Sequence, residues 1–75
     1  MINLGKLEIE TSLGDLYLLP AMDRAEVEKA LPRGPVTESM TTLALINASF
    51  AVLSIPFRII KVVRFEGDVL WTSSV

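Results

Sequence analysis

Polar and apolar residues alternate near the beginning of the chain. Residues 6–10 read Lys-Leu-Glu-Ile-Glu, and this period of two is typical of a half-buried strand. Turn residues at 11–15 separate that strand from the apolar run 16–19, which is followed by Pro20. We therefore expect a β-hairpin over residues 6–19, with Pro20 ending its second strand.

The pattern then changes to that of a short helix over residues 22–31. Asp23 can cap the N-terminus, and Glu26 stands three residues later, where a capping-box partner belongs. Pro32 ends the helix and opens a rigid connector over 32–35. The apolar positions form one narrow stripe at helical spacing: Val27, Ala30 and Leu31.

The remaining residues are the most apolar and are rich in β-branched side chains, which favour strands. We expect a β block over residues 41–73, with turns at 47–49 and at 66–68. Together the elements predict one β-rich α+β domain over residues 1–75. Their order is ββ-α-ββββ, and the strands form a small sheet or a barrel.

One alternative concerns a membrane. The segment 39–57 carries no charged residue and is near the length that spans a bilayer. A basic flank follows it, as in a positive-inside segment. Asn47 and Ser49 lie near its centre, where a lone span offers them no hydrogen-bond partner, so we disfavour the membrane interpretation.

Composition raises a question of stability. The chain has 75 residues, of which 51% are hydrophobic, and a mean hydropathy of +0.49. Folding a chain of this mass buries roughly 7,400 Å² of surface. If about 60% of that surface is apolar, its burial stabilises the fold by about 110 kcal/mol at ~25 cal/mol/Å². Conformational entropy costs about the same, at ~1.5 kcal/mol per residue. The balance is near zero, so we expect apolar surface to be completed by other protein subunits.

The missing residue types narrow the chemistry. The sequence has no cysteine and no histidine, so it offers no disulfide, thiolate zinc site, cysteine nucleophile or Ser-His-Asp triad. We expect no enzyme activity, cofactor or metal. Glu8 and Glu10 share one face of their strand, but a cation site needs more oxygen ligands, so we interpret them as a solvated face of an edge hairpin.

Basic and aromatic residues gather toward the C-terminus. Strand spacing would put Arg58 and Arg64 on one face and Lys61 on the other. Basic residues with interleaved aromatics suggest a nucleic-acid-binding small barrel, but a net charge of −2 makes nucleic acid the weaker alternative. We prefer a protein interface, for which the candidate residues are Phe57, Phe65, Trp71, Arg58, Lys61, Arg64 and Tyr17.

The layout resembles that of small accessory proteins of tailed bacteriophage virions. The shared features are the hairpin that ends at Leu19-Pro20, the short acidic helix, and the apolar β block that ends Glu66-Gly67-Asp68-Val69-Leu70-Trp71. The resemblance is one of layout over most of the chain. It implies a capsid decoration, cement or connector protein located in the virion.

Overall fold

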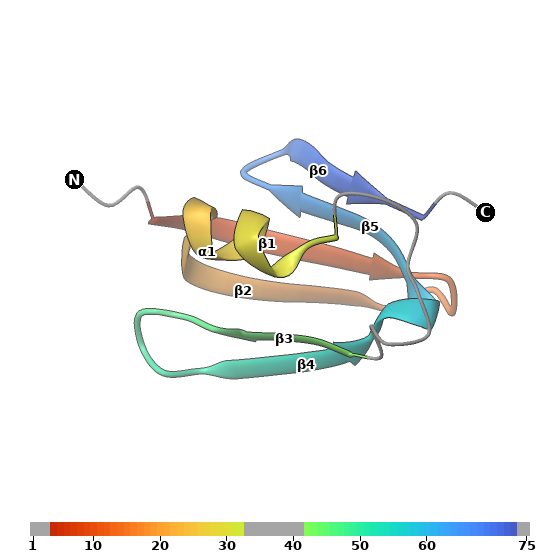
Figure 1. The fold of residues 1–75 in the computed structure, drawn as a ribbon, viewed down its shortest axis with the longest axis horizontal. Helices are drawn as coiled ribbons and strands as arrows, with labels where there is room; N and C mark the ends of the chain where they lie inside the picture. The colour runs from red at the N-terminus through yellow and green to blue at the C-terminus, as the bar shows by residue number, and fades with distance from the viewer. Residues whose placement is uncertain (1–3, 33–41, 74–75) are drawn as a thin grey trace.

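Figure 1 shows a computed structural model of the chain, which describes residues 4–32 and 42–73. The order of elements is the expected ββ-α-ββββ of a β-rich α+β fold. The elements are β1 (Leu4–Thr11), β2 (Leu16–Asp23), α1 (Arg24–Ala30), β3 (Thr42–Ile46), β4 (Val52–Pro56), the 3₁₀ turn η1 (Phe57–Ile59), β5 (Ile60–Phe65) and β6 (Asp68–Thr72). Most of the predicted connector, at 33–35, and the first residue of the β block, at 41, lie outside the described residues.

The strands form two antiparallel sheets rather than a barrel in the described part of the chain. The larger sheet has the order β2-β1-β5-β6, and β3 and β4 form a separate two-stranded hairpin. The connection between β5 and β6 is the predicted turn, in which Glu66 and Gly67 have φ angles of 50° and 87°. Positive φ at both central residues is the geometry of a type I′ turn, which suits the twist of a tight hairpin.

Strand β2 does not end at Pro20, as the sequence suggested, but continues to Asp23. Leu19 pairs with Leu7 and Met22 pairs with Gly5, so β2 holds one extra residue between these pairs. Pro20 therefore lies in a β-bulge on an edge strand, where its missing N–H breaks no ladder bond. The hairpin spans 4–23 instead of 6–19 for this reason.

Helix α1 is shorter than the predicted 22–31, because Met22 and Asp23 belong to β2. The predicted cap is confirmed: the Asp23 carboxylate accepts a hydrogen bond from the Ala25 backbone N–H at 3.0 Å. Val27 is fully buried, and Leu31 provides the C-cap. The helix thus begins where the extended backbone of β2 stops, and it packs on β2 and β3.

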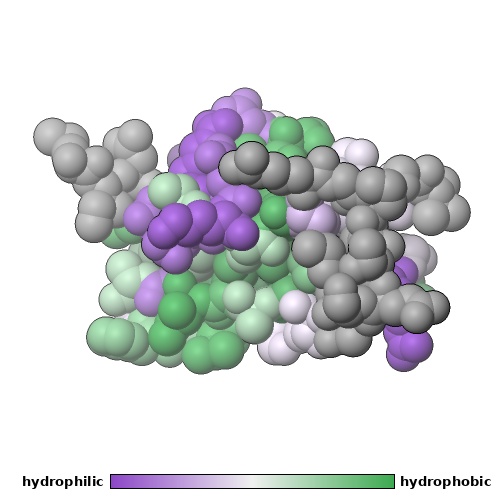
Figure 2. Space-filling model, viewed as in Figure 1, coloured by the Kyte–Doolittle hydropathy of each residue, from purple (hydrophilic) through white to green (hydrophobic). Residues whose placement is uncertain are grey.

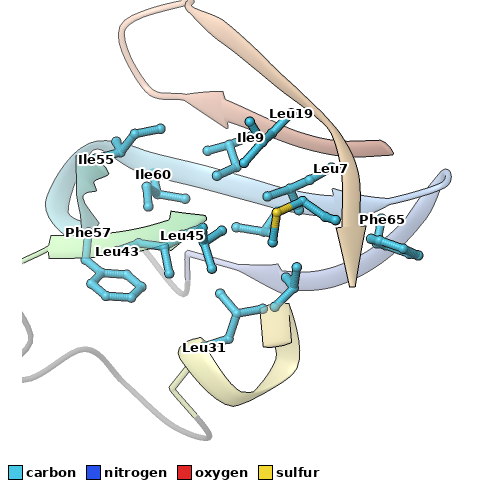
Figure 3. Close-up of a cluster of buried hydrophobic side chains, with 13 residues drawn as sticks. Leu7, Ile9, Leu19, Leu31, Leu43, Leu45, Ile55, Phe57, Ile60 and Phe65 are labelled. Atoms are coloured by element: carbon cyan, nitrogen blue, oxygen red, sulfur yellow. The ribbon is translucent and has the colours of Figure 1, made fainter. Parts of the chain in front are cut away.

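The hydrophobic core lies between the inner face of the four-stranded sheet, α1 and the β3–β4 hairpin (Figure 3). Every element that the structure describes except β6 contributes a buried side chain, and β6 packs Leu70 and Trp71 against the cluster. The buried residues are Leu7, Ile9, Leu19, Met22, Val27, Leu31, Leu43, Leu45, Ile55, Phe57, Ile60, Val63 and Phe65.

The segment considered as a membrane span folds as two strands and a turn over its described residues, 42–57. Residues 47–51 form the connection, and it includes the predicted turn at 47–49. None of the helices in the described ranges is long and apolar enough to cross a bilayer.

Candidate functional site

The turn of the β3–β4 hairpin is organised by one buried side chain. Asn47 is only 7% exposed, and its Oδ1 accepts hydrogen bonds from the backbone N–H groups of Ser49 at 2.9 Å and Ala51 at 2.8 Å. Its Nδ2 donates to the Pro20 carbonyl at 2.7 Å. An asparagine in this position stabilises a turn through its own side chain, and here it also fixes the turn to β2.

Phe50 stands at the tip of this turn and is directed into solvent. Its side chain is 81% exposed, and its φ angle is +63°. A bulky residue with left-handed backbone is strained and persists only where the surroundings impose it. Here the Phe50 N–H donates to the Asn47 carbonyl at 3.0 Å, so the turn holds the aromatic ring outward.

Next to Phe50, the solvent face of the hairpin carries no charge. Register pairs Ile46 with Val52 directly behind the turn, and these side chains are 54% and 69% exposed. We call this surface the hairpin face. It consists of Phe50 and the outward side chains of β3 and β4, which are Thr42, Ala44, Ile46, Val52, Ser54 and Pro56.

Figure 2 shows an apolar region over the turn end of β3 and β4. The exposed Ile46, Phe50 and Val52 belong to that end of the hairpin. The polar surface of α1 adjoins it, so the boundary between the two is sharp in this view. Isolated apolar side chains on a surface need no explanation, but contiguous ones mark contact sites. The hairpin face is therefore the strongest candidate for a contact surface in the described structure.

One network of charged residues lies apart from the hairpin face, on the outer face of the four-stranded sheet. Glu8 and Glu10 do share this face, but β1 is a central strand and not the expected edge. Glu8 lies 3.6 Å from the Lys6 ammonium and 3.4 Å from the Arg64 guanidinium. Glu10 lies 3.5 Å from Lys61 and 3.6 Å from Arg64. The acidic pair is thus neutralised by cations of the same chain.

The expected faces of the basic residues were wrong. Arg58 is not in a strand but in η1. Lys61 is an extra residue in β5, because Glu10 pairs with Val62 and Thr11 pairs with Ile60. This bulge interrupts the period of two, so that Lys61 and Arg64 reach the same carboxylate.

The predicted aromatic anchors are divided between core and surface. Phe57 and Phe65 are each 5% exposed and belong to the core, so a partner could not reach them without opening the fold. Trp71 is half-buried and packs edge-to-face on Phe57, with ring centroids 5.9 Å apart. Tyr17, on the edge strand β2, is 38% exposed.

A further charged contact joins α1 to β6. Arg24 donates to Glu28 at 2.8 Å and to Asp68 at 3.4 Å. The hydrogen bond to Glu28 raises the pKa of the Arg24 guanidinium above its ordinary value, and the charges of Glu28 and Asp68 add to the effect. The Arg24 guanidinium therefore stays charged at physiological pH.

The described carboxylates do not gather into a metal-binding cluster. In the described ranges no three Asp or Glu side chains are grouped to hold a metal ion, and every buried side-chain nitrogen or oxygen has a hydrogen-bond partner. The carboxylates that do approach one another are engaged by lysine and arginine.

Sequence reasoning did not single out Phe50, Ile46 or Val52. The signal was present in the uncharged run 39–57, which can be interpreted as two strands around the turn at Asn47. Because side chains alternate along a strand, Ile46 points away from the buried Leu45 and toward solvent. No protein-family model, curated protein or solved structure matches the chain.

Proposed function

We propose that the protein is a non-enzymatic structural subunit that functions by contact with other protein subunits. The observation that carries the proposal is the hairpin face, a surface without charged residues on which Phe50, Ile46 and Val52 are exposed to solvent. Aromatic side chains of this kind contribute most to binding when they enter a pocket of a partner. The absence of histidine and cysteine from the sequence supports a role without catalysis.

The energy available at this face is substantial. Exposed fractions of 81%, 69% and 54% amount to about two complete apolar side chains. Burying them stabilises a complex by about 3–6 kcal/mol before the cost of association. Because the Asn47 turn already fixes the backbone, little ordering entropy opposes docking. The hairpin face is therefore suited to act as a preformed contact.

Within this class, the resemblance in layout favours a component of a bacteriophage virion, such as a capsid decoration, cement or connector protein. Nucleic acid is a weaker candidate partner, because Lys61 and Arg64 are already paired with Glu8 and Glu10. A bare phosphate backbone would have to compete with these internal carboxylates.

Sedimentation of an extract from the cells that produce the protein tests the proposal. We expect the native chain to sediment with an assembly far larger than its own 8.2 kDa. The Phe50→Ser variant should remain among the light fractions. The matched control is Leu13→Ser, which removes another exposed side chain, 72% accessible, from the β1–β2 loop and should leave sedimentation unchanged.

Two outcomes would overturn the proposal. One is a native chain that sediments only as a monomer or dimer, since a structural subunit must be part of something larger. The other is an equal change in the sedimentation of Phe50→Ser and Leu13→Ser, because assembly would then not depend specifically on the hairpin face. Circular dichroism of both variants shows whether the fold is intact.

A further inference from the structure

Strand β2 is an edge of the four-stranded sheet, and only part of that edge is covered. At its far end, Asn47 Nδ2 donates to the Pro20 carbonyl, and the Ala48 N–H donates to the Ala21 carbonyl at 3.0 Å. Over 16–19, no strand in the described ranges pairs with this edge. Unpaired N–H and C=O groups of an edge strand are a template for another strand.

The side chains of this stretch do not protect the edge. Leu16, Tyr17 and Leu18 are 53%, 38% and 52% exposed, and none of residues 16–22 is charged. Natural edge strands are commonly blocked by lysine, proline or a bulge. In β2 the proline and the bulge come only after Leu19, so the first half of the strand remains open.

We propose that this edge pairs with the same edge of a second copy of the chain, in antiparallel register about a two-fold axis at Tyr17. The sequence Leu-Tyr-Leu is symmetric about its centre, so Leu16 of each copy lies opposite Leu18 of the other. Both leucines belong to the outer face, because Leu16 pairs with Glu10 and Leu18 pairs with Glu8 within the chain. The four leucines of the pair form one apolar cluster around the axis.

The structure favours this register over a shifted one. An axis at Leu18 would place Leu16 opposite Pro20, which has no N–H and lies in the bulge. An axis at Tyr17 confines the new ladder to residues 15–19, clear of the carbonyls that Asn47 and Ala48 already bond.

The glutamates of the outer face do not oppose this pairing. Across the joined sheet, Glu10 of one copy and Glu8 of the other lie three strand spacings apart, about 14 Å. That separation exceeds the Debye length of about 8 Å at physiological salt, so their repulsion is screened. Each carboxylate also keeps its own lysine or arginine partner.

The inference rests on the proposed function and deepens it by naming one subunit contact as a second copy. Paired edges of five residues bury far less than the roughly 800 Å² per partner of a standard interface. The dimer should therefore be weak and reversible. We expect the mass of the purified chain to rise from 8.2 kDa toward twice that value between roughly 1 μM and 1 mM.

Sedimentation equilibrium of two charge-matched variants tests the location of the contact. Leu18→Lys places a cation in the leucine cluster and should weaken the dimer at least tenfold. Val69→Lys makes the same change in charge on β6, at a side chain that is 58% exposed, and should leave the dimer unchanged. A mass of 8.2 kDa at every concentration, or equal weakening by both variants, would overturn the inference.

The register has its own test, because the native chain contains no cysteine. Directly opposed residues of antiparallel strands have Cα atoms about 4.5–5.5 Å apart, within the range that a disulfide spans. Under mild oxidation Tyr17→Cys should form a covalent dimer. A mixture of Leu16→Cys and Leu18→Cys should yield mainly the mixed dimer, and a preference for Leu18→Cys homodimers would contradict the proposed axis.

The two proposals fail in different ways. If the cellular assembly depends on Phe50 while purified Leu18→Lys associates like the native chain, the edge contact is wrong and the structural role stands. If the purified chain dimerises through β2 but sediments in extracts only as that dimer, the structural role in a larger assembly is wrong.

Discussion

Replacing Asn47 by alanine removes the side chain that joins the β3–β4 turn to itself and to strand β2. Three hydrogen bonds disappear: those to the N–H groups of Ser49 and Ala51, and the one to the carbonyl of Pro20. All three lie between 2.7 and 2.9 Å, so each is well formed. We expect the Asn47→Ala variant to be clearly less stable than the native chain.

The magnitude follows from the surroundings of the three bonds. A net hydrogen bond contributes about 0.5–1.5 kcal/mol, and the freed groups of Pro20, Ser49 and Ala51 belong to exposed residues that water can reach. We therefore expect a loss of about 2–3 kcal/mol. A chain of this length is stable by about 4–11 kcal/mol in total. The urea midpoint should fall by about 2–3 M, at ~1 kcal/mol per M.

Urea unfolding provides the assay. Trp71 is the only tryptophan and packs on Phe57, so its fluorescence reports on the core, and circular dichroism reports on the strands. Ser49→Ala is the matched control, because that exposed side chain should contribute less than about 0.5 kcal/mol. If Asn47→Ala unfolds within about 0.5 kcal/mol of the native chain, the turn does not depend on Asn47 and the preformed hairpin face loses its basis.

Three further predictions concern stability. Phe50→Gly should raise the free energy of unfolding by about 1 kcal/mol, because glycine accepts the positive φ, and an unchanged or lower urea midpoint would refute the strain. Gly5→Ala should lower the free energy of unfolding by about 1–3 kcal/mol, because the new Cβ would lie 2.7 Å from the Phe65 ring. A variant that melts at the same temperature as the native chain would contradict this packing. Arg64→Met should cost about 0.5–1 kcal/mol by loss of its contacts with Glu8 and Glu10, and 1 M salt should reduce the difference; a loss of stability independent of salt would argue against an ionic cause.

The elements that the sequence predicted well are those with a local cause. Asp23 caps a helix because its carboxylate reaches the backbone two residues later. Asn47 forms a turn through bonds to its near neighbours, and Gly67 supplies the left-handed backbone of a tight hairpin. Each of these signals depends on residues that are close in sequence, so no tertiary contact is needed to recognise it.

The errors arose where distant residues decide the outcome. Pro20 is tolerated within β2 because that strand is an edge with a bulge, and both facts depend on pairing with β1. Lys61 and Arg64 share a face because of a bulge against β1, whose carboxylates lie more than fifty positions away in the sequence. Local alternation contains no information about either bulge.

The sequence also did not reveal which aromatic residues are buried. Phe57 and Phe65 were expected as contact residues, but they lie in the core, whereas Phe50 is exposed. Composition indicated that some apolar surface should need a partner, but it did not indicate which residues form that surface. The positive φ of Phe50 is set by the Asn47 turn, and it became visible only with the backbone.

The most direct test of the central claim is photo-crosslinking from position 50. Benzoylphenylalanine would replace Phe50 in cells that make the protein, and Lys29 on α1, with a side chain 75% exposed, would carry the same group as a control. We predict that position 50 crosslinks to one protein species through a defined set of residues, and that position 29 does not. Crosslinks to lipid, or equal crosslinking from both positions, would contradict the account of the hairpin face as a subunit contact.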